Sequence, residues 1–304
     1  MNPIKEFVLN AYYMTSLPAR QRAAIDRAAR QTEPVRVLFY HRVADQHPNG
    51  WTMSTAAFAR QIHWLRHRFD LVTLKEAQSR IAAGRNRWPT ACITFDDGYA
   101  NNLEFALPLL LRQRIPFTYF VSTNHVLRGE PFAHDVEAGR SLAPNTLSQL
   151  RGLAAAGVEA VEIGAHTRGH VHLGPPLSRE AMVDEIVGSK RELEAALNRE
   201  VRYFAFPFGQ LTDLSTAAFQ IAYEAGYSGV CSAYGGYNWP GDDSFHLRRI
   251  HADPELVRFK NWLMIDPRKL RHPFQFDAGD FRRPATEVAV SPAENVAMSA
   301  TISN

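Results

Sequence analysis

Short apolar runs alternate along this chain with longer segments in which apolar residues recur every third or fourth position. The runs are rich in β-branched and aromatic residues, and they predict buried strands at 35–40, 91–95, 117–121, 161–164, 203–206, 229–232 and 247–250, with a short extended piece at 71–74. The helical spacing predicts helices at 58–69, 75–83, 103–114, 146–156, 178–197 and 215–225. Strands that alternate with helices indicate a parallel α/β architecture.

The segments outside this alternation have different patterns. Residues 1–34 predict an N-terminal helical extension, because 19–30 is rich in Ala and Arg and Glu33-Pro34 ends the helix. The folded domain is expected at 35–266. The tail, 267–304, is expected to be irregular, with disorder from Pro284. Within the domain, 124–144 reads as one long loop, and such loops are often functional.

Composition narrows the function classes. A net charge of +3 on 304 residues gives no argument for a nucleic-acid partner. Two Cys far apart in sequence, Cys92 and Cys231, fit a reducing compartment. The first residues lack the features of a secretory signal, and no stretch reaches the ~18 apolar residues that span a bilayer. We therefore expect a cytoplasmic protein. The weakly amphipathic segment 7–17 could make a peripheral membrane contact, although packing against the domain is favoured.

Two adjacent carboxylates follow the predicted strand at 91–95. Asp96 and Asp97 repel each other, and their apolar neighbours make ionisation costlier still. A bound cation removes that cost, with one carboxylate binding the metal and the other accepting a proton. An Asp-Gly pair is also common in plain turns, so this motif alone leaves both readings open.

A pair of histidines follows the strand at 161–164. His166 and His170 are four residues apart and can converge on one ion, whereas nearby His172 is expected to be an ordinary surface residue. One Asp and two His make three ligands, and catalytic zinc sites commonly use three and leave a position for water. The metal would activate that water and a free carboxylate would act as base, which implies hydrolysis of an amide or ester.

All of these residues come just after predicted strands. His41 follows the first strand, and the turn 206–209 follows another, where backbone N–H groups could face a developing oxyanion. Barrel enzymes place their sites at the carboxyl ends of strands. One barrel mouth would bring these segments together.

The three motifs, in this order, resemble the polysaccharide deacetylase family, also called NodB-homology or carbohydrate esterase family 4. The first is Thr94-Phe95-Asp96-Asp97-Gly98-Tyr99, and the second is His166-Thr167-Arg168-Gly169-His170. The third is Phe206-Pro207-Phe208-Gly209, and Tyr40-His41-Arg42-Val43 is typical of one branch. The resemblance covers roughly residues 35–255.

The resemblance implies a distorted (β/α) barrel with seven strands and removal of acetyl groups from N-acetylated sugars. It assigns the role of base to Asp96 and an oxyanion-hole N–H to Phe208. It assigns Asp97, His166 and His170 as ligands of a divalent metal, with Zn²⁺ as the first choice and Co²⁺, Mn²⁺ or Ni²⁺ as alternatives.

Two positions depart from the family pattern. Many members have an Arg that orients the base where this chain has Ala205, and Arg249, with Arg202 behind it, is the candidate substitute. The late Leu-x-His motif that supplies the general acid has no clean match. His41 is favoured for that role over His251, because it should lie at the barrel mouth.

The resemblance leaves the substrate open. We expect His134 and Asp135, in the long loop, to contact it, and Trp239, with Tyr237 and Asn238, to form a sugar-stacking rim. The partner is an N-acetylated glycan or a sugar precursor, and a precursor suits a cytoplasmic enzyme better. Two alternatives are a hydrolase of other amides or O-acetyl esters and a catalytically silent carbohydrate-binding protein of a polysaccharide assembly system.

Overall fold

A computed structural model describes residues 3–156, 160–174, 176–270 and 276–282. The main sheet holds β1 (Val35–Tyr40), β4 (Asp70–Leu71), β5 (Thr90–Phe95), β6 (Phe117–Val121), β7 (Val161–Ala165), β8 (Tyr203–Ala205), β9 (Gly229–Ser232) and β10 (His246–His251). A small two-stranded sheet holds β2 (Arg42–Val43) and β3 (Thr52–Met53).

The α-helices are α1 (Pro3–Arg30), α2 (Thr55–Arg66), α3 (Leu74–Ala82), α4 (Ala106–Arg112), α5 (Thr123–Arg128), α6 (Ala133–Glu137), α7 (Leu147–Ala156), α8 (Arg179–Val183), α9 (Ser189–Leu197), α10 (Thr216–Glu224), α11 (Leu256–Leu263) and α12 (Pro267–Leu270). Two 3₁₀ helices, η1 (Ala100–Leu103) and η3 (Leu211–Asp213), and one π-helical turn, η2 (Asp184–Gly188), complete the described elements. Hydroxyl side chains begin several of the α-helices by accepting a backbone N–H: Ser54 for α2, Thr73 for α3, Ser178 for α8 and Ser215 for α10.

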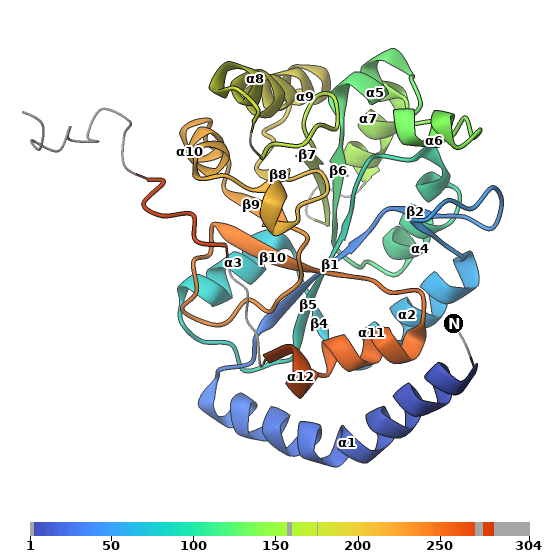
Figure 1. The fold of residues 1–304 in the computed structure, drawn as a ribbon, viewed down its shortest axis with the longest axis vertical. Coiled ribbons are helices and arrows are strands. Elements are labelled where there is room, and N and C mark those ends of the chain that lie inside the picture. Colours follow the sequence, from blue (N-terminus) through green and yellow to red (C-terminus); the bar gives the residue numbers. More distant parts are fainter. Residues whose placement is uncertain (1–2, 157–159, 175, 271–275, 283–304) are drawn as a thin grey trace, which may run out of the picture.

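The main sheet closes into a barrel. Its strands run in the order β1, β10, β9, β8, β7, β6, β5, and β1 pairs with β5 as well as with β10, always in parallel. Seven strands therefore form the ring, while β4 pairs with the first two residues of β5. Helices surround the ring in Figure 1. This confirms the predicted α/β class and the (β/α)7 barrel.

Alternation along the strands separates an inner from an outer layer. The inner apolar cluster contains Val35, Val37 and Cys92. The larger cluster, under the outer helices, contains Leu38 and Ile93. The inner cluster also contains apolar residues of α3, so α3 packs against the interior at one end of the barrel. The free cysteines Cys92 and Cys231 are both buried there.

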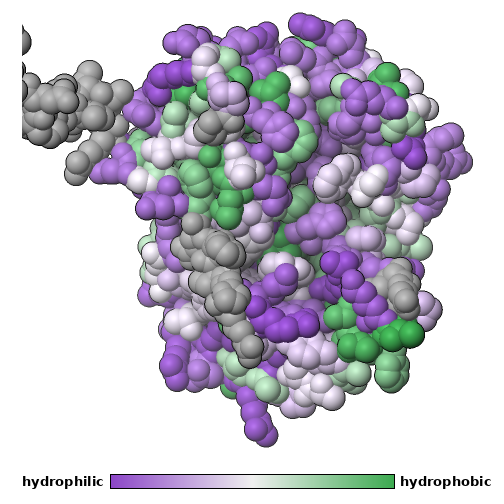
Figure 2. Space-filling view, viewed as in Figure 1, coloured by the Kyte–Doolittle hydropathy of each residue, from purple (hydrophilic) through white to green (hydrophobic). Residues whose placement is uncertain are grey.

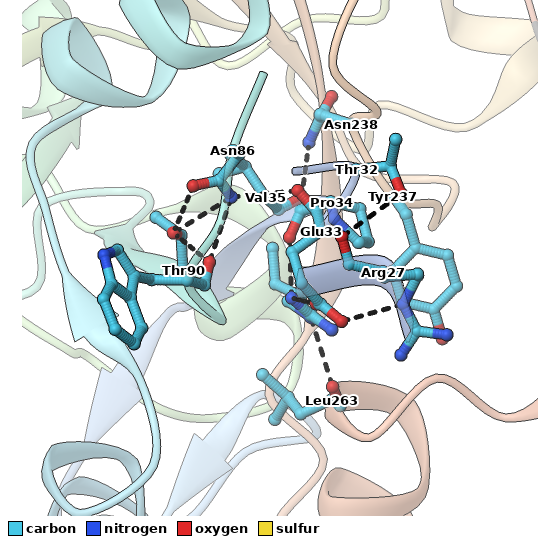
Figure 3. Close-up of polar contacts among 12 residues, drawn as sticks. Arg27, Thr32, Glu33, Pro34, Val35, Asn86, Thr90, Tyr237, Asn238 and Leu263 are labelled. Atoms are coloured by element: carbon cyan, nitrogen blue, oxygen red, sulfur yellow. Dashed lines mark hydrogen bonds and ion pairs between the residues drawn. The ribbon is translucent and has the colours of Figure 1, made fainter. Parts of the chain in front are cut away.

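A buried polar cluster holds the amino-terminal end of the barrel, where the strands begin (Figure 3). Glu33 is fully buried and binds Arg27, from α1, at 2.8 Å and Arg36, from β1, at 3.0 Å. Val35 and Asn238 exchange backbone hydrogen bonds of 2.8 and 3.1 Å. Because Val35 is the first residue of β1, the segment around Asn238 lies at this end of the barrel.

Several segments differ from the sequence prediction, among them β2 and β3, which it did not contain. The segment 124–144 is not one irregular loop, because it contains α6 and most of α5. The predicted helix 178–197 is divided by the π-helical turn η2. The helix α11 was not predicted. The tail expected to be irregular begins with α12, and its Phe276 and Phe281 rings contact Phe219. The disorder expected from Pro284 lies outside the described residues.

Candidate active site

The first of the sequence motifs, residues 94–99, follows β5, where the chain leaves the barrel wall. Strand alternation places Thr94 and Asp96 on the same side of the strand. The backbone then turns, with φ of 71° at Asp97 and 88° at Gly98. A Cβ on Gly98 would lie 2.9 Å from Val121 Cγ1, so both the backbone angle and the space require glycine. This turn lets two neighbouring carboxylates point in different directions.

Asp97 and the two predicted histidine ligands converge. Asp97 Oδ1 lies 3.2 Å from His170 Nε2 and 3.5 Å from His166 Nε2, and one ligand atom of each residue lies within 4.8 Å of the others. The His166 Nδ1 atom lies 2.8 Å from the Ala205 carbonyl oxygen. A proton on Nδ1 leaves the Nε2 lone pair facing Asp97, which is the usual arrangement of a metal-binding imidazole.

The electrostatics of this cluster suit a cation. Asp97 Oδ1 is buried and has no hydrogen-bond partner among the described residues. Burial would raise the pKa of Asp97, but His166 and His170 lower it well below its usual value. Burial is also the main cause that lowers the pKa of His170, so its neutral, ligating form is favoured. One carboxylate and two neutral imidazoles fit a divalent metal such as zinc.

Asp96 has a different partner. The guanidinium of Arg249, on β10, donates to both Asp96 oxygens at 2.6 and 2.8 Å, and it also binds Thr94 Oγ1 and the Ser232 carbonyl. Burial opposes ionisation of Asp96, yet Arg249 holds its pKa below the usual value. Arg202 instead pairs with Glu162, beside the start of β9. Thus Arg249, rather than Arg202, stands beside the predicted base.

His41 lies next to these carboxylates. Its Nδ1 atom is buried without a hydrogen-bond partner among the described residues. Burial lowers its pKa, while Asp97 and Asp96 act in the opposite direction. Its ring lies 4.9 Å from the Trp51 ring and 6.4 Å from that of His251, whose pKa burial lowers to about 4.

Phe208 occupies the turn after β8 with φ of 59°. Its ring stacks on His172 at 3.8 Å and lies 5.0 Å from His170. None of the described residues accepts a hydrogen bond from its backbone N–H. His172 itself pairs with Asp213 at 2.9 Å and lies outside the metal cluster, as expected.

The predicted substrate contacts fall in three different places. His134 is partly exposed, and its ring lies 6.0 Å from that of His170, beside the cluster. Asp135 is buried, and its carboxylate accepts from Tyr99 Oη and Asn49 Nδ2, which makes it a structural residue of the loop. The prediction for Trp239 is wrong, because it follows Asn238 at the amino-terminal end of the barrel and cannot form a rim at the mouth.

Two residues near the site were missed from the sequence. Glu185, in η2, accepts the N–H groups of Arg168 and Gly169, each at 2.8 Å, and so holds the loop that carries His170. Trp51, between β2 and β3, covers His41. Neither residue had a usable signal, because Trp239 also follows a predicted strand and lies at the other end of the barrel, and Glu185 lies in a helix among several acidic residues.

The fold and the site together define a class of protein. Its members are parallel α/β barrels that carry, where the strands end, an Asp–His–His cluster suited to a divalent cation. The family model for polysaccharide deacetylase matches residues 83–230. Poly-beta-1,6-N-acetyl-D-glucosamine N-deacetylase of Staphylococcus aureus (strain N315) is 24% identical over 169 residues. YxkH of Bacillus subtilis (strain 168), whose name assigns it to the same family, is 22% identical over 223 residues.

The coverage of these matches differs. The match with YxkH covers 72% of each chain. The match with the staphylococcal protein covers 54% of this chain and 56% of the relative, so this chain spans little more than half of that relative's length. Two solved structures share the fold. IcaB from Ammonifex degensii has a TM-score of 0.66 at 24% identity, covering 77% of this chain and 98% of its own. Streptococcus pyogenes deacetylase PplD has a TM-score of 0.63 at 20% identity, covering 77% and 99%.

Residues 83–230, just under half of the chain, thus match the polysaccharide deacetylase family, a family of hydrolases, and the barrel is shared with solved structures of similar proteins.

Proposed function

We propose that this protein is a metal-dependent hydrolase that removes acetyl groups from N-acetylated sugars of a polysaccharide or glycan precursor. The observation that carries the proposal is the arrangement of two differently partnered carboxylates: Asp97 beside two histidines and Asp96 beside Arg249. The match to the polysaccharide deacetylase family supports the substrate class. A silent binding protein has no need of a buried, charge-paired base next to a metal site.

Asp97, His166 and His170 would hold the metal. A divalent cation there, with Zn²⁺ as first choice, supplies Lewis acidity to the acetyl carbonyl and lowers the pKa of water. Asp96, kept ionised by Arg249, accepts the proton of the attacking water. The Phe208 N–H donates to the oxyanion that develops on the former carbonyl oxygen.

Burial favours neutral His41 in the resting protein. The negative charge that develops on the reacting carbon's oxygen would raise the pKa of His41, so that its imidazole takes over the proton that Asp96 removed from water. His41 would then give this proton to the sugar nitrogen as the C–N bond breaks, which releases acetate and a free amine. His251, whose pKa burial lowers to about 4, is the weaker candidate for this step.

Metal analysis and acetate release test the proposal together. Purified protein should contain a divalent metal and release acetate from N-acetylglucosamine oligomers, lipid-linked sugars or small acetylated sugars. Asp96→Asn should keep the metal and lose activity, whereas His170→Ala should lose both. Metal-free protein that cannot be loaded would refute the metal site. Loaded protein that cleaves only O-acetyl esters would reassign the substrate.

We also propose a peripheral contact of α1 with a membrane surface. No helix among the described residues is long and apolar enough to cross a bilayer. One face of α1 packs against α11 through Arg20, which binds Asn261 at 2.7 Å. Another face exposes Ile4, Phe7, Val8 and Met14 to solvent. Figure 2 shows apolar side chains gathered at the lower right, where α1 begins in Figure 1.

A further inference from the structure

We propose that Trp51 is an aromatic platform on which a sugar ring stacks beside His41, which makes it a glycan-binding subsite of this protein. The inference rests on the proposed function, since it takes the substrate to be an N-acetylated glycan. It adds a residue that no motif of the sequence contains.

The exposure of Trp51 is the first observation. Its side chain is 50% exposed, although it contacts two imidazole rings: His41 at 4.9 Å and His251 at 6.3 Å. The plane of the Trp51 ring is tilted by 35° from that of His41 and is nearly perpendicular to that of His251. The two histidines therefore cover part of the indole and leave the rest to solvent.

The second observation is that hydrogen bonds from a buried side chain hold the loop that carries Trp51. The buried guanidinium of Arg42 donates to the carbonyl oxygens of Gln46 and His47, both at 2.9 Å, and to Thr52 Oγ1 at 3.0 Å. Its Nε atom donates to Asn101 Oδ1 at 2.8 Å. One buried cation thus fixes both ends of the loop.

Asn49 provides a second attachment inside the loop. Its Oδ1 accepts the backbone N–H of Trp51 at 3.0 Å and the Thr52 hydroxyl at 2.7 Å. Its Nδ2 donates to the buried carboxylate of Asp135 at 2.9 Å. The backbone of Trp51 is therefore held in place before any ligand arrives. A pre-ordered aromatic surface binds at a lower entropic cost than a mobile one.

The position of His41 connects this surface to the reaction. A sugar whose acetamido group reaches Asp97 and Asp96 must place its ring near His41, and Trp51 covers that imidazole. The apolar face of a pyranose ring stacks on an indole, while its hydroxyls stay in water. Trp51 therefore contacts the reacting sugar or the next unit of the chain.

The other tryptophans make a useful comparison. Trp64, Trp239 and Trp262 are partly buried against the core. Trp88 is 59% exposed, but it precedes β5 and therefore lies at the amino-terminal end of the barrel. Trp88 is thus a matched control: an exposed indole on the same protein, away from the mouth.

The experiment separates binding from catalysis. Binding of N-acetylglucosamine oligomers is measured by calorimetry on metal-loaded Asp96→Asn protein, alone and combined with Trp51→Ala, Trp51→Phe or Trp88→Ala. We expect Trp51→Ala to weaken binding by at least roughly tenfold, as for a buried aromatic contact. Trp51→Phe should recover most of the affinity, and Trp88→Ala should bind like its parent.

Steady-state acetate release by the same substitutions with Asp96 intact completes the test. The proposal expects KM to rise in Trp51→Ala while kcat and its pH profile are kept. Unchanged affinity in Trp51→Ala overturns it, and a fall in kcat with a shifted pH profile would assign Trp51 to the positioning of His41 instead. If Trp51→Ala does not fold, loss of iodide quenching of Trp51 on adding the oligomer, in a Trp88→Phe background, decides the question. Glycan binding without any acetate release would refute the proposed function but not the subsite.

Discussion

Asp96 and Asp97 are neighbours in sequence, yet they have different electrostatic partners. The carboxylate of Asp96 faces a guanidinium, and that of Asp97 faces two imidazoles. The left-handed backbone at Asp97 and Gly98 produces this separation, because an extended strand would have put the side chains on opposite faces of the barrel wall. A proton acceptor and a metal ligand can therefore occupy adjacent positions.

Arg249 offers a test of how Asp96 is held. Lysine at this position keeps the charge but loses the two parallel hydrogen bonds to the carboxylate. We expect Arg249→Lys to lower kcat by about 10²-fold, within the range that general acid–base catalysis contributes, while the metal content stays the same. Acetate release and metal analysis are the measurements. Arg202→Lys is the control, since Arg202 pairs with Glu162 away from the mouth. Undiminished kcat in Arg249→Lys would show that the base needs only a nearby charge.

At the scale of elements, the barrel strands were predictable because buried parallel strands are continuous apolar runs. The elements α6 and α12 were not, because helices of five and four residues are too short to show a periodic pattern. The π-helical turn η2 has no sequence signature that separates it from the α-helix around it. The pairing of Arg249 with Asp96 joins residues 153 positions apart and depends on closure of the barrel.

Trp51 and Trp239 show how the connection between strands decides at which end of the barrel a loop residue lies. Both lie in loops, and residue type alone does not distinguish them. Trp51 follows β1 and so lies at the mouth, whereas Trp239 lies in a connection that returns to the start of β10. In a parallel barrel, the loop after a strand begins at the mouth and the residues before a strand lie at the opposite end. Residue 239 lies seven positions after β9 and seven before β10, so this rule alone does not place it, and only the hydrogen bonds between Asn238 and Val35 do.

Glu185 tests whether a helix supports the metal loop. Its carboxylate accepts two backbone N–H groups in the loop between the proposed ligands His166 and His170, and His170 itself has an unfavourable φ of 55°. We expect Glu185→Ala to weaken zinc binding by roughly 10- to 100-fold, as for other outer-shell partners of metal ligands. Competition with a chromophoric chelator measures the affinity. Glu137→Ala, an exposed acidic residue, is the control. Equal zinc affinity in wild type and Glu185→Ala would mean that the loop keeps its shape without the carboxylate.

At the scale of the whole molecule, charge is unevenly distributed. The segments 3–30, 55–69 and 253–270 contain α1, α2, α11 and α12, and they hold twelve Lys and Arg against five Asp and Glu. Their net charge of +7 exceeds the +3 of the whole chain, so the remainder is negative. These helices adjoin one another, since α11 contacts both α1 and α2. Arg268 lies over the Tyr12 ring at 4.0 Å, which places a cation beside the packed face of α1.

The apolar face of α1 and this positive charge predict binding to anionic lipid. Phe7 and Met14 are 74% and 62% exposed, and their spacing of seven residues puts them on one face. An amphipathic helix with basic neighbours binds an anionic interface through apolar insertion and electrostatic attraction.

We expect the protein to sediment with phosphatidylglycerol vesicles more than with phosphatidylcholine vesicles, and to be released as salt rises. Phe7→Ser combined with Met14→Ser should lose this binding, whereas Val183→Ser, an exposed apolar residue of α8, should keep it. Equal sedimentation of all three proteins would exclude the α1 face. If the protein instead self-associates without binding vesicles, and the double substitution abolishes this self-association, a second copy of the chain covers the α1 face. Such a dimer would have to overcome the repulsion between two positively charged layers.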